Sequence, residues 1–154
     1  MAMQHTPLLM SNILDRGATV APYEEIVTLT ESGVRRQTYR ETRDRAHQLA
    51  HALAGSGIKV GDRVGTFMWN GSRHLEAYHA VAGMGAVLHT LNVRLSPKDL
   101  EYIINHAEDQ IIIVDADVLP LLEVLNGKIP GVRKVVVATE DGFEGWSTEL
   151  PDPV

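Results

Sequence analysis

Two runs of consecutive apolar residues constrain the fold of this chain more than any other feature. "QIIIVD" begins at Gln110 and "KVVVAT" begins at Lys134, and neither run alternates with polar residues. A strand that is apolar at every position is typical of a sheet covered on both faces. Helical patterns separate these runs from two earlier strand patterns, which begin at Arg63 and Ala86. This alternation predicts an α/β fold, with a mainly parallel sheet and helices on both faces.

The N-terminal part of the chain predicts a hairpin followed by a capped helix. Residues 25–30 and 34–38 are rich in β-forming side chains and flank a turn that contains Gly33. Thr38–Glu41 matches a capping box, in which the hydroxyl and the carboxylate each bind a backbone N–H. The helix that follows has its predicted buried stripe at Ala46, Leu49, Ala50 and Leu53.

Three further helices are predicted from apolar residues at helical spacing. The first is expected to bury Leu8, Leu9, Ile13 and Leu14. The second follows "NGS" and is expected to bury Leu75, Tyr78, Val81 and Ala82. The third is expected to bury Leu100, Ile103, Ile104 and Ala107. We expect residues 1–139 to form one α/β domain, and residues 140–154, which show no periodicity, to be a linker or a chain end.

Composition excludes several classes of function. The chain has 154 residues, a net charge of −6 and no cysteine. Disulfides, thiolate metal sites and cysteine nucleophiles are therefore excluded. The acidic balance argues against a nucleic-acid partner. No run of 18 apolar residues occurs, so no transmembrane segment is predicted, and we expect a cytoplasmic protein.

For four histidines of the predicted helices, a structural or surface role is expected. His47 and His51 are four residues apart with Asp44 on the same side, a spacing that can bind a metal. The apolar stripe places them on the outer face, however, and no third ligand can be assigned. His79 shares a face with apolar residues, as a hydrogen-bonded core histidine does. His106 lies at a helix C-terminus, where the helix dipole favours an imidazole.

The segment "GAVLHTLNVRL" (85–95) holds the best candidate site residues. Asn92 and Arg94 follow a strand that contains His89, and ligands of open α/β sheets bind beyond the carboxyl ends of strands. Ser96 opens the next helix, whose N–H groups could hold an anion. In the competing interpretation, Ser96 only caps the helix and Arg94 forms a surface ion pair. The residues alone favour this second interpretation, a central strand with its exit loop, because such loops are common in the fold.

Known catalytic motifs are absent. "GMG" at 83–85 lacks the third glycine of a dinucleotide fingerprint, and "NGK" at 126–128 lacks the other residues of a P-loop. Neither G-x-S-x-G nor H-E-x-x-H occurs. We therefore assign no residue to catalysis, to a cofactor or to a metal.

Three segments share the pattern of one enzyme family: "TYRETRDRAHQLAHAL" (38–53), "GDRVGTFMWN" (61–70) and "AVAGMGAVLHTLNVRLSPKDLEYIINHAED" (80–109). Together they resemble the N-terminal region of the adenylate-forming acyl-CoA synthetases, in particular the medium- and long-chain fatty acid branch. The resemblance extends from about Pro7 to Thr139. Val93 departs from it, because the family often has proline there.

The resemblance implies a two-step ligase that uses ATP, Mg²⁺ and coenzyme A on a fatty acid substrate. A carboxylate attacks ATP to give an acyl-adenylate and pyrophosphate, and the thiol of coenzyme A then displaces AMP. The family's phosphate-binding loop is rich in Ser, Thr and Gly and ends in a Pro-Lys-Gly type sequence, and no such stretch occurs in residues 1–154. We therefore expect the chain to be the first subdomain of a ligase, truncated before that loop and inactive alone.

Three alternatives stay open. Within the family, the full protein could be an acyl-adenylate-only ligase or a ligase of aryl acids. From another class, the chain could be a stand-alone α/β interaction module without chemistry. A flavodoxin-like nucleotide binder has only fold analogy in its favour. A homodimer is also open.

Overall fold

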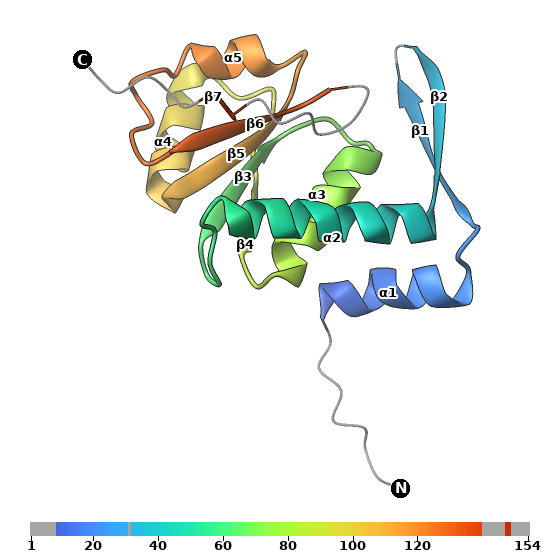
Figure 1. Cartoon of the computed structure of the whole chain (residues 1–154). Helices are drawn as coiled ribbons and strands as arrows, with labels where there is room; N and C mark the ends of the chain where they lie inside the picture. The colour runs from blue at the N-terminus through green and yellow to red at the C-terminus, as the bar shows by residue number, and fades with distance from the viewer. Residues whose placement is uncertain (1–8, 31, 140–146, 149–154) are drawn as a thin grey trace, which may run out of the picture.

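The computed structural model describes residues 9–30, 32–139 and 147–148. In chain order its elements are α1 (Met10–Val20), β1 (Glu25–Thr30), β2 (Gly33–Thr38), α2 (Tyr39–Gly55), β3 (Arg63–Phe67), α3 (Ser72–Gly83), β4 (Val87–Thr90), α4 (Pro97–Ala107), β5 (Asp109–Asp115), α5 (Leu119–Glu123), β6 (Lys134–Ala138) and β7 (Ser147–Thr148) (Figure 1).

The strands form two separate sheets. β1 and β2 pair antiparallel as the predicted hairpin, and the main sheet has the order β4-β3-β5-β6-β7. The contacts of β3 with β4 and β5, and of β5 with β6, are parallel, whereas β7 pairs antiparallel with β6. The mainly parallel α/β fold is thus confirmed. The predicted tail, 140–154, lies outside the described residues apart from β7.

One expectation about this sheet is wrong, because β4 is an edge strand and not a central one. After β4 the chain crosses back over β3 to reach β5, so β3 and β5 both lie inside the sheet, with β5 as the third of its five strands. The side chain of Val87 at the start of β4 is accordingly 49% exposed.

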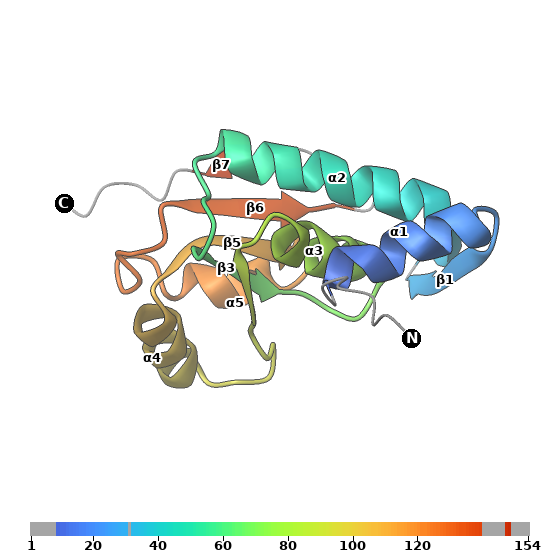
Figure 2. The same cartoon turned by 90° about the horizontal axis from the view of Figure 1, so that it is seen from below.

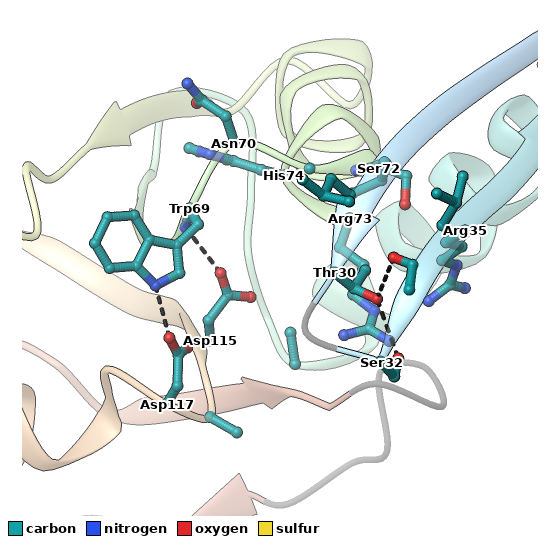
Figure 3. A pocket seen from close by; sticks show the side chains of 17 residues that line it. Thr30, Ser32, Arg35, Trp69, Asn70, Ser72, Arg73, His74, Asp115 and Asp117 are labelled. Carbon is teal, nitrogen blue, oxygen red and sulfur yellow. Dashed lines mark hydrogen bonds between the residues drawn. The ribbon is translucent and has the colours of Figure 1, made fainter.

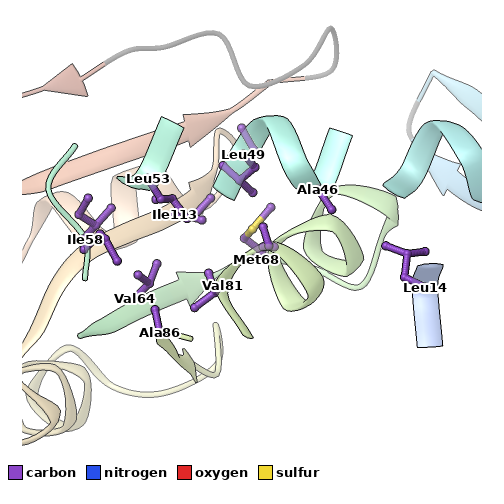
Figure 4. Close-up of a cluster of buried hydrophobic side chains, with 14 residues drawn as sticks. Leu14, Ala46, Leu49, Leu53, Ile58, Val64, Met68, Val81, Ala86 and Ile113 are labelled. Atoms are coloured by element: carbon purple, nitrogen blue, oxygen red, sulfur yellow. The ribbon is translucent and has the colours of Figure 1, made fainter. Parts of the chain in front are cut away.

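Helices cover both faces of the sheet, and each face has its own hydrophobic core (Figure 2). Ile111 and Ile113 of β5 pack with residues of α1, α2 and α3 (Figure 4). Ile112 and Val114 point the other way and pack with residues of α4 and α5. All four side chains are fully buried, and burial of each contributes about 1.5–3 kcal/mol. This arrangement explains the unbroken apolar run in the sequence.

The predicted start of α2 is confirmed. The Thr38 hydroxyl accepts a hydrogen bond from the Glu41 N–H at 3.2 Å, and the Glu41 carboxylate accepts from the Thr38 N–H at 2.8 Å. From this capped end α2 runs along one face of the sheet and buries Ala46, Leu49 and Leu53.

The predicted buried face of α3 is confirmed only in part, since Leu75 and Ala82 are half-buried. Val81 is buried, but Tyr78 is 38% exposed, while Glu76 is fully buried. Glu76 accepts hydrogen bonds from Arg45 of α2 and from Gln37 of β2, each at 2.7 Å. Because these partners lie on other elements, a carboxylate can occupy a core position of α3. The hydrophobic periodicity of the helix alone cannot predict this.

The buried face of α1 also differs from the prediction. Leu14 is buried together with Ala18, but Leu9 and Ile13 are exposed, and Leu8 lies outside the described residues. α1 approaches α2 along its small residues, since a methyl group added at Gly17 would lie 3.3 Å from the ring of Tyr39. None of the described helices is long and apolar enough to cross a membrane.

Candidate functional site

The carboxyl ends of β3 and β5 lie side by side at the point where the chain changes direction across the sheet. β3 leads through α3 to β4 on one side, and β4 leads through α4 to β5 on the other. The two crossover helices pack on opposite faces of the sheet. In open α/β sheets such a switch point leaves a crevice above the strand ends, which is where ligands bind.

An open cavity of about 890 Å³ lies at this switch point (Figure 3). Three segments provide most of its lining: the hairpin, the β3–α3 loop with the first turn of α3, and the loop after β5. The lining residues are Thr28, Leu29, Thr30, Ser32, Gly33, Val34, Arg35, Trp69, Asn70, Gly71, Ser72, Arg73, His74, Asp115, Ala116, Asp117 and Ala138.

Trp69 is fixed in the cavity wall by two carboxylates. Its backbone N–H donates to Asp115 Oδ2 at 2.8 Å, and its indole Nε1–H donates to Asp117 Oδ2 at 2.7 Å. Burial raises the pKa of Asp115, and the hydrogen bond from the Trp69 backbone opposes this shift. The Trp69 side chain nevertheless stays 45% exposed. It therefore presents a flat apolar surface in a fixed orientation.

The hairpin is attached to the start of α3. Thr28 Oγ1 accepts a hydrogen bond from the Ser72 N–H at 3.1 Å, which satisfies one of the N–H groups that a helix start leaves without a partner. The loop passes so close to the hairpin that a methyl group at Gly71 would lie 3.3 Å from the Thr28 methyl. These contacts position the hairpin as the outer wall of the cavity.

Behind this wall, His74 is buried and is paired with Thr66 of β3. Its Nε2 lies 2.9 Å from Thr66 Oγ1. Burial lowers the pKa of His74, and the Trp69 backbone opposes this shift. The imidazole is therefore neutral at pH 7 and does not add positive charge to the site.

Arg73 has an unused hydrogen-bond donor beside the cavity. Its Nε is buried and has no partner among the described residues. Burial is the main cause that lowers the pKa of this guanidinium, followed by the positive charge of Arg35. The group stays charged at neutral pH all the same, because arginine does not lose its proton in proteins. The cavity thus combines two guanidinium groups with an exposed indole.

The candidate residues of the β4–α4 loop do not line this cavity. Asn92 Oδ1 accepts from the Arg94 N–H at 3.0 Å, which forms a local turn. Ser96 Oγ accepts from the Asp99 N–H at 3.2 Å and caps α4. The Arg94 side chain is exposed, and the expected ion pair of Arg94 is not formed among the described residues. Local hydrogen bonds therefore account for this loop apart from the Arg94 side chain.

His89 has a structural role as well. Its Nδ1 lies 2.7 Å from Asp109 Oδ2, and the Asp109 side chain is fully buried at the start of β5. Burial raises the pKa of Asp109, and the hydrogen bond from His89 opposes this shift. Asp109 begins β5, at the end of the strands away from the cavity, and His89 is in register with Gly65 in the middle of β3. The pair ties β4 to β5 across β3.

The helical histidines form no metal site among the described residues. His47 and His51 are exposed, as predicted, and with His79 they line a smaller cavity of about 340 Å³ between α1, α2 and α3. His79 is half-buried, and its buried Nδ1 has no partner in the described part of the chain. The expected hydrogen bond is nevertheless present, with the backbone of Met10, and it opposes the lowering of the His79 pKa by burial. His106 lies in the last turn of α4 and stacks on Tyr102.

Sequence reasoning missed the cavity, although a signal for it was present. Polar residues occur where β3 and β5 end: Asn70 lies three positions after β3, Asp115 is the last residue of β5, and Asp117 lies two positions after it. The rule that ligands bind beyond strand ends applies to these strands as it does to β4. The contribution of the hairpin could not be predicted, since nothing in its local pattern shows where it packs.

The chain matches the family model described as "AMP-binding enzyme" over residues 14–152. It is 46% identical to a long-chain-fatty-acid–CoA ligase of Thermus thermophilus, over 94% of this chain and 27% of that protein. It is 35% identical to a medium-chain-fatty-acid–CoA ligase of Ectopseudomonas oleovorans, over 97% of this chain and 27% of that protein.

A solved structure shows the same fold. An anthranilate–CoA ligase in complex with anthranoyl-AMP superposes with a TM-score of 0.77 and 27% identity, covering 89% of this chain and 26% of that one. The chain thus spans about a quarter of the length of the relatives that it matches. The family match covers most of the 154 residues, and the sheet, the crossovers and the hairpin agree with it. The chain belongs to the AMP-binding enzyme family.

Proposed function

We propose that the chain forms the N-terminal α/β subdomain, residues 1–139, of an ATP-dependent fatty acid–CoA ligase. In the first step, a carboxylate oxygen attacks the α-phosphorus of ATP and pyrophosphate leaves. In the second step, the thiol sulfur of coenzyme A attacks the acyl carbon and AMP leaves. We extend the proposal to a cytoplasmic enzyme, in keeping with a chain of 154 residues that has no cysteine.

One observation carries this proposal: the identity of 46% to a long-chain-fatty-acid–CoA ligase along nearly the whole chain. A relative of 40% identity is a 3-methylmercaptopropionyl-CoA ligase of Ruegeria pomeroyi, so the relatives differ in the acid that they are named for. Similarity to a long-chain and a medium-chain fatty acid ligase supports a fatty acid substrate.

Among the described residues, no cluster of three or more acidic or histidine side chains could hold a metal ion. Asp115 and Asp117, the carboxylates that line the cavity, each accept a hydrogen bond from Trp69. The whole sequence also lacks a Ser/Thr/Gly-rich phosphate loop. In the proposed ligase, this subdomain supplies the scaffold and one wall of the active-site region.

A stand-alone interaction module is the second candidate, and one feature favours it. Val27, Leu29 and Val34 of the hairpin are exposed by 55%, 83% and 59%. Such an apolar face can pack against another copy of the chain or another protein. A ligase subdomain would also present this face, toward the rest of its own polypeptide, so the exposed residues alone do not decide between the two.

Pyrophosphate release decides between them. Under the ligase proposal, the protein encoded by the complete gene releases pyrophosphate from ATP and Mg²⁺ only when a fatty acid is added. It forms the thioester once coenzyme A is present. Octanoate, palmitate and benzoate, tested in parallel, separate a fatty acid ligase from an aryl acid ligase. Pyrophosphate release without thioester formation would indicate an acyl-adenylate-only ligase. The 154-residue chain should release no pyrophosphate with any of these acids.

A further inference from the structure

We propose that the cavity at the β3/β5 switch point binds the anionic head group, a phosphate or a carboxylate, of a small aromatic molecule. Arg73 and Arg35 are its charged partners, and the indole of Trp69 is the surface against which its ring lies. This site is built from residues of the described chain alone. The proposal therefore does not depend on the ligase activity, and the two can fail separately.

The first argument is the unsatisfied donor of Arg73. A buried N–H without an acceptor costs about 1–3 kcal/mol, so native structures rarely leave one unpaired. Glu76 on the same helix does not supply the acceptor. Its Oε1 accepts from Arg45 and Gln37. Its Oε2 accepts no hydrogen bond from any described residue, Arg73 included. Because Nε itself is buried, an anion in the cavity provides this acceptor once the Arg73 side chain turns toward it.

The second argument is the accumulation of positive charge around this donor. Arg35 of the hairpin lines the same cavity as Arg73. The charges of Arg35 and Arg45 both lower the pKa of the Arg73 guanidinium, in addition to burial. Asp115 and Glu76 act in the opposite direction but more weakly than Arg35. Like charges held close together favour the binding of a counter-ion between them.

The third argument is the separation of charge within the cavity. Asp115 and Asp117 lie beside Trp69, whereas Arg35 lies on the hairpin side with Thr30 and Ser32 (Figure 3). Because each carboxylate accepts an N–H of Trp69, its charge is partly satisfied. Arg73 is within electrostatic reach of both Asp115 and Arg35. An anionic head group would therefore be repelled from the two carboxylates and attracted toward Arg35. The exposed indole then borders the space left for the rest of the ligand.

The size of the cavity fits a small molecule better than a bare ion. A volume of about 890 Å³ is within the range of about 300–1,000 Å³ that is typical of small-molecule sites. A phosphate ion alone would leave most of this volume and the Trp69 surface unused. We therefore expect an aromatic ring attached to the anion to increase the affinity.

Isothermal titration of the 154-residue chain with phenyl phosphate, benzoate, phenol and inorganic phosphate tests the site. We expect one molecule of phenyl phosphate or benzoate to bind per chain, more tightly than inorganic phosphate, and phenol to bind weakly or not at all. The tighter of the two aromatic anions identifies the head group, phosphate or carboxylate. If neither phenyl phosphate nor benzoate binds, the proposal is overturned. It is also overturned if phenol binds as tightly as these aromatic anions.

Variants locate the bound ligand. Arg73→Gln should weaken binding by about tenfold or more, as expected for loss of a charge-assisted hydrogen bond. Arg35→Gln removes a charge from the hairpin and should weaken binding in the same direction. It keeps the test decisive if Arg73→Gln fails to fold, which circular dichroism would show. Arg36→Gln is the matched control, because Arg36 lies next to Arg35 but pairs with Glu25 at 2.6 Å and does not line the cavity.

The pattern across the variants decides the outcome. Loss of affinity in the Arg73 and Arg35 variants, with unchanged affinity in the Arg36 variant, supports the site. Trp69→Ala should then weaken the binding of phenyl phosphate or benzoate and leave the binding of inorganic phosphate unchanged. Equal losses in the Arg35 and Arg36 variants would show a general charge effect and overturn the proposal. Unchanged affinity in the Arg73 and Arg35 variants would overturn it as well.

Discussion

Glu76 is the residue on which the packing of α2, α3 and the hairpin most depends. Its side chain is fully buried and accepts hydrogen bonds from Arg45 and Gln37. Replacement by alanine removes one acceptor from each donor, although Gln37 Nε2 keeps its hydrogen bond to Thr42 Oγ1 and Arg45, 28% exposed, can regain some hydration. We predict that Glu76→Ala lowers the free energy of unfolding by about 2–4 kcal/mol, measured by urea denaturation.

Glu25→Ala is the control for this prediction. Glu25 also pairs with an arginine, but both partners are exposed, by 45% and 60%. Exposed pairs of this kind contribute about 0–1 kcal/mol. Equal losses of stability in the Glu76 and Glu25 variants would contradict the structural role assigned to Glu76.

The buried imidazole of His74 should make stability depend on pH. Burial lowers its pKa below the usual value of 6.5, so the folded state resists protonation that the unfolded chain accepts. As the pH falls below about 6.5, the unfolded chain therefore gains protons first and the free energy of unfolding decreases. His79 acts in the same direction, because burial lowers its pKa too.

Urea denaturation at about pH 7.5 and about pH 5.5 measures this effect. Wild type should lose more stability between these two values than His74→Gln, which has no titrating group at this position. The exposed His51 provides the control, and His51→Gln should behave as wild type. An equal loss in wild type and in His74→Gln would show that His74 is not the titrating group.

At the scale of single residues, sequence reasoning succeeded where a role depends on neighbours in the chain. The capping pair of Thr38 and Glu41 is such a case. It failed where a partner comes from elsewhere in the fold. Glu76 and Arg45 are 31 positions apart, and no local pattern predicts that a glutamate will be buried. The donor of Arg73 was missed for the same reason.

Among the elements, the β4–α4 connection gives a direct test of the scaffold interpretation. Ser96 accepts the Asp99 N–H at the start of α4, whereas the Arg94 side chain is exposed. We predict that Ser96→Ala lowers the free energy of unfolding by about 1 kcal/mol. Arg94→Ala should change it by less than about 0.5 kcal/mol. A larger loss in the Arg94 variant, measured by thermal or urea denaturation, would indicate a role that the structure does not show.

The close packing of β3 on β5 gives a further prediction. A methyl group at Gly65 would lie 3.1 Å from Ile112 Cγ1 and 3.2 Å from Asp109 Oδ2. Gly65→Ala should therefore displace these groups, cost about 1–3 kcal/mol of stability, and disturb the His89–Asp109 contact. Unfolding by urea and the NMR resonances of the His89 ring measure the two effects.

Gly55→Ala is the matched control, because a methyl group at Gly55 meets nothing within 4 Å. Alanine is also favoured over glycine in a helix by up to about 1 kcal/mol. Gly55→Ala should thus keep or increase stability. Gly65→Ala with wild-type stability and an unchanged His89 resonance would contradict the packing described for β3.

The elements that sequence predicts best are those whose environment is uniform along their length. Residues 111–114 of β5 and 135–138 of β6 are apolar without a break because helices cover both faces of the sheet. The position of a strand within the sheet is not encoded in this way. β4 was expected at the centre, and it lies at the edge because the α4 crossover carries the chain past β3.

For the whole molecule, the central feature is a sheet whose two middle strands end at a switch point, with a hairpin closing one side of the crevice. The mainly parallel fold and the family resemblance could be predicted from sequence, since both depend on patterns spread over about a hundred residues. The cavity could not, because it requires three segments to meet in space. The identity to acyl-CoA ligases along this scaffold supports the proposal that it is one part of such an enzyme.

Sequencing the gene beyond the codon for Val154 tests this proposal most directly. The account predicts that the reading frame continues into a Ser/Thr/Gly-rich loop that ends in a Pro-Lys-Gly type sequence, followed by the remainder of a ligase. A stop codon directly after Val154 would contradict it. The chain would then share the scaffold of the family without the residues for its chemistry, and an interaction module would be the better account.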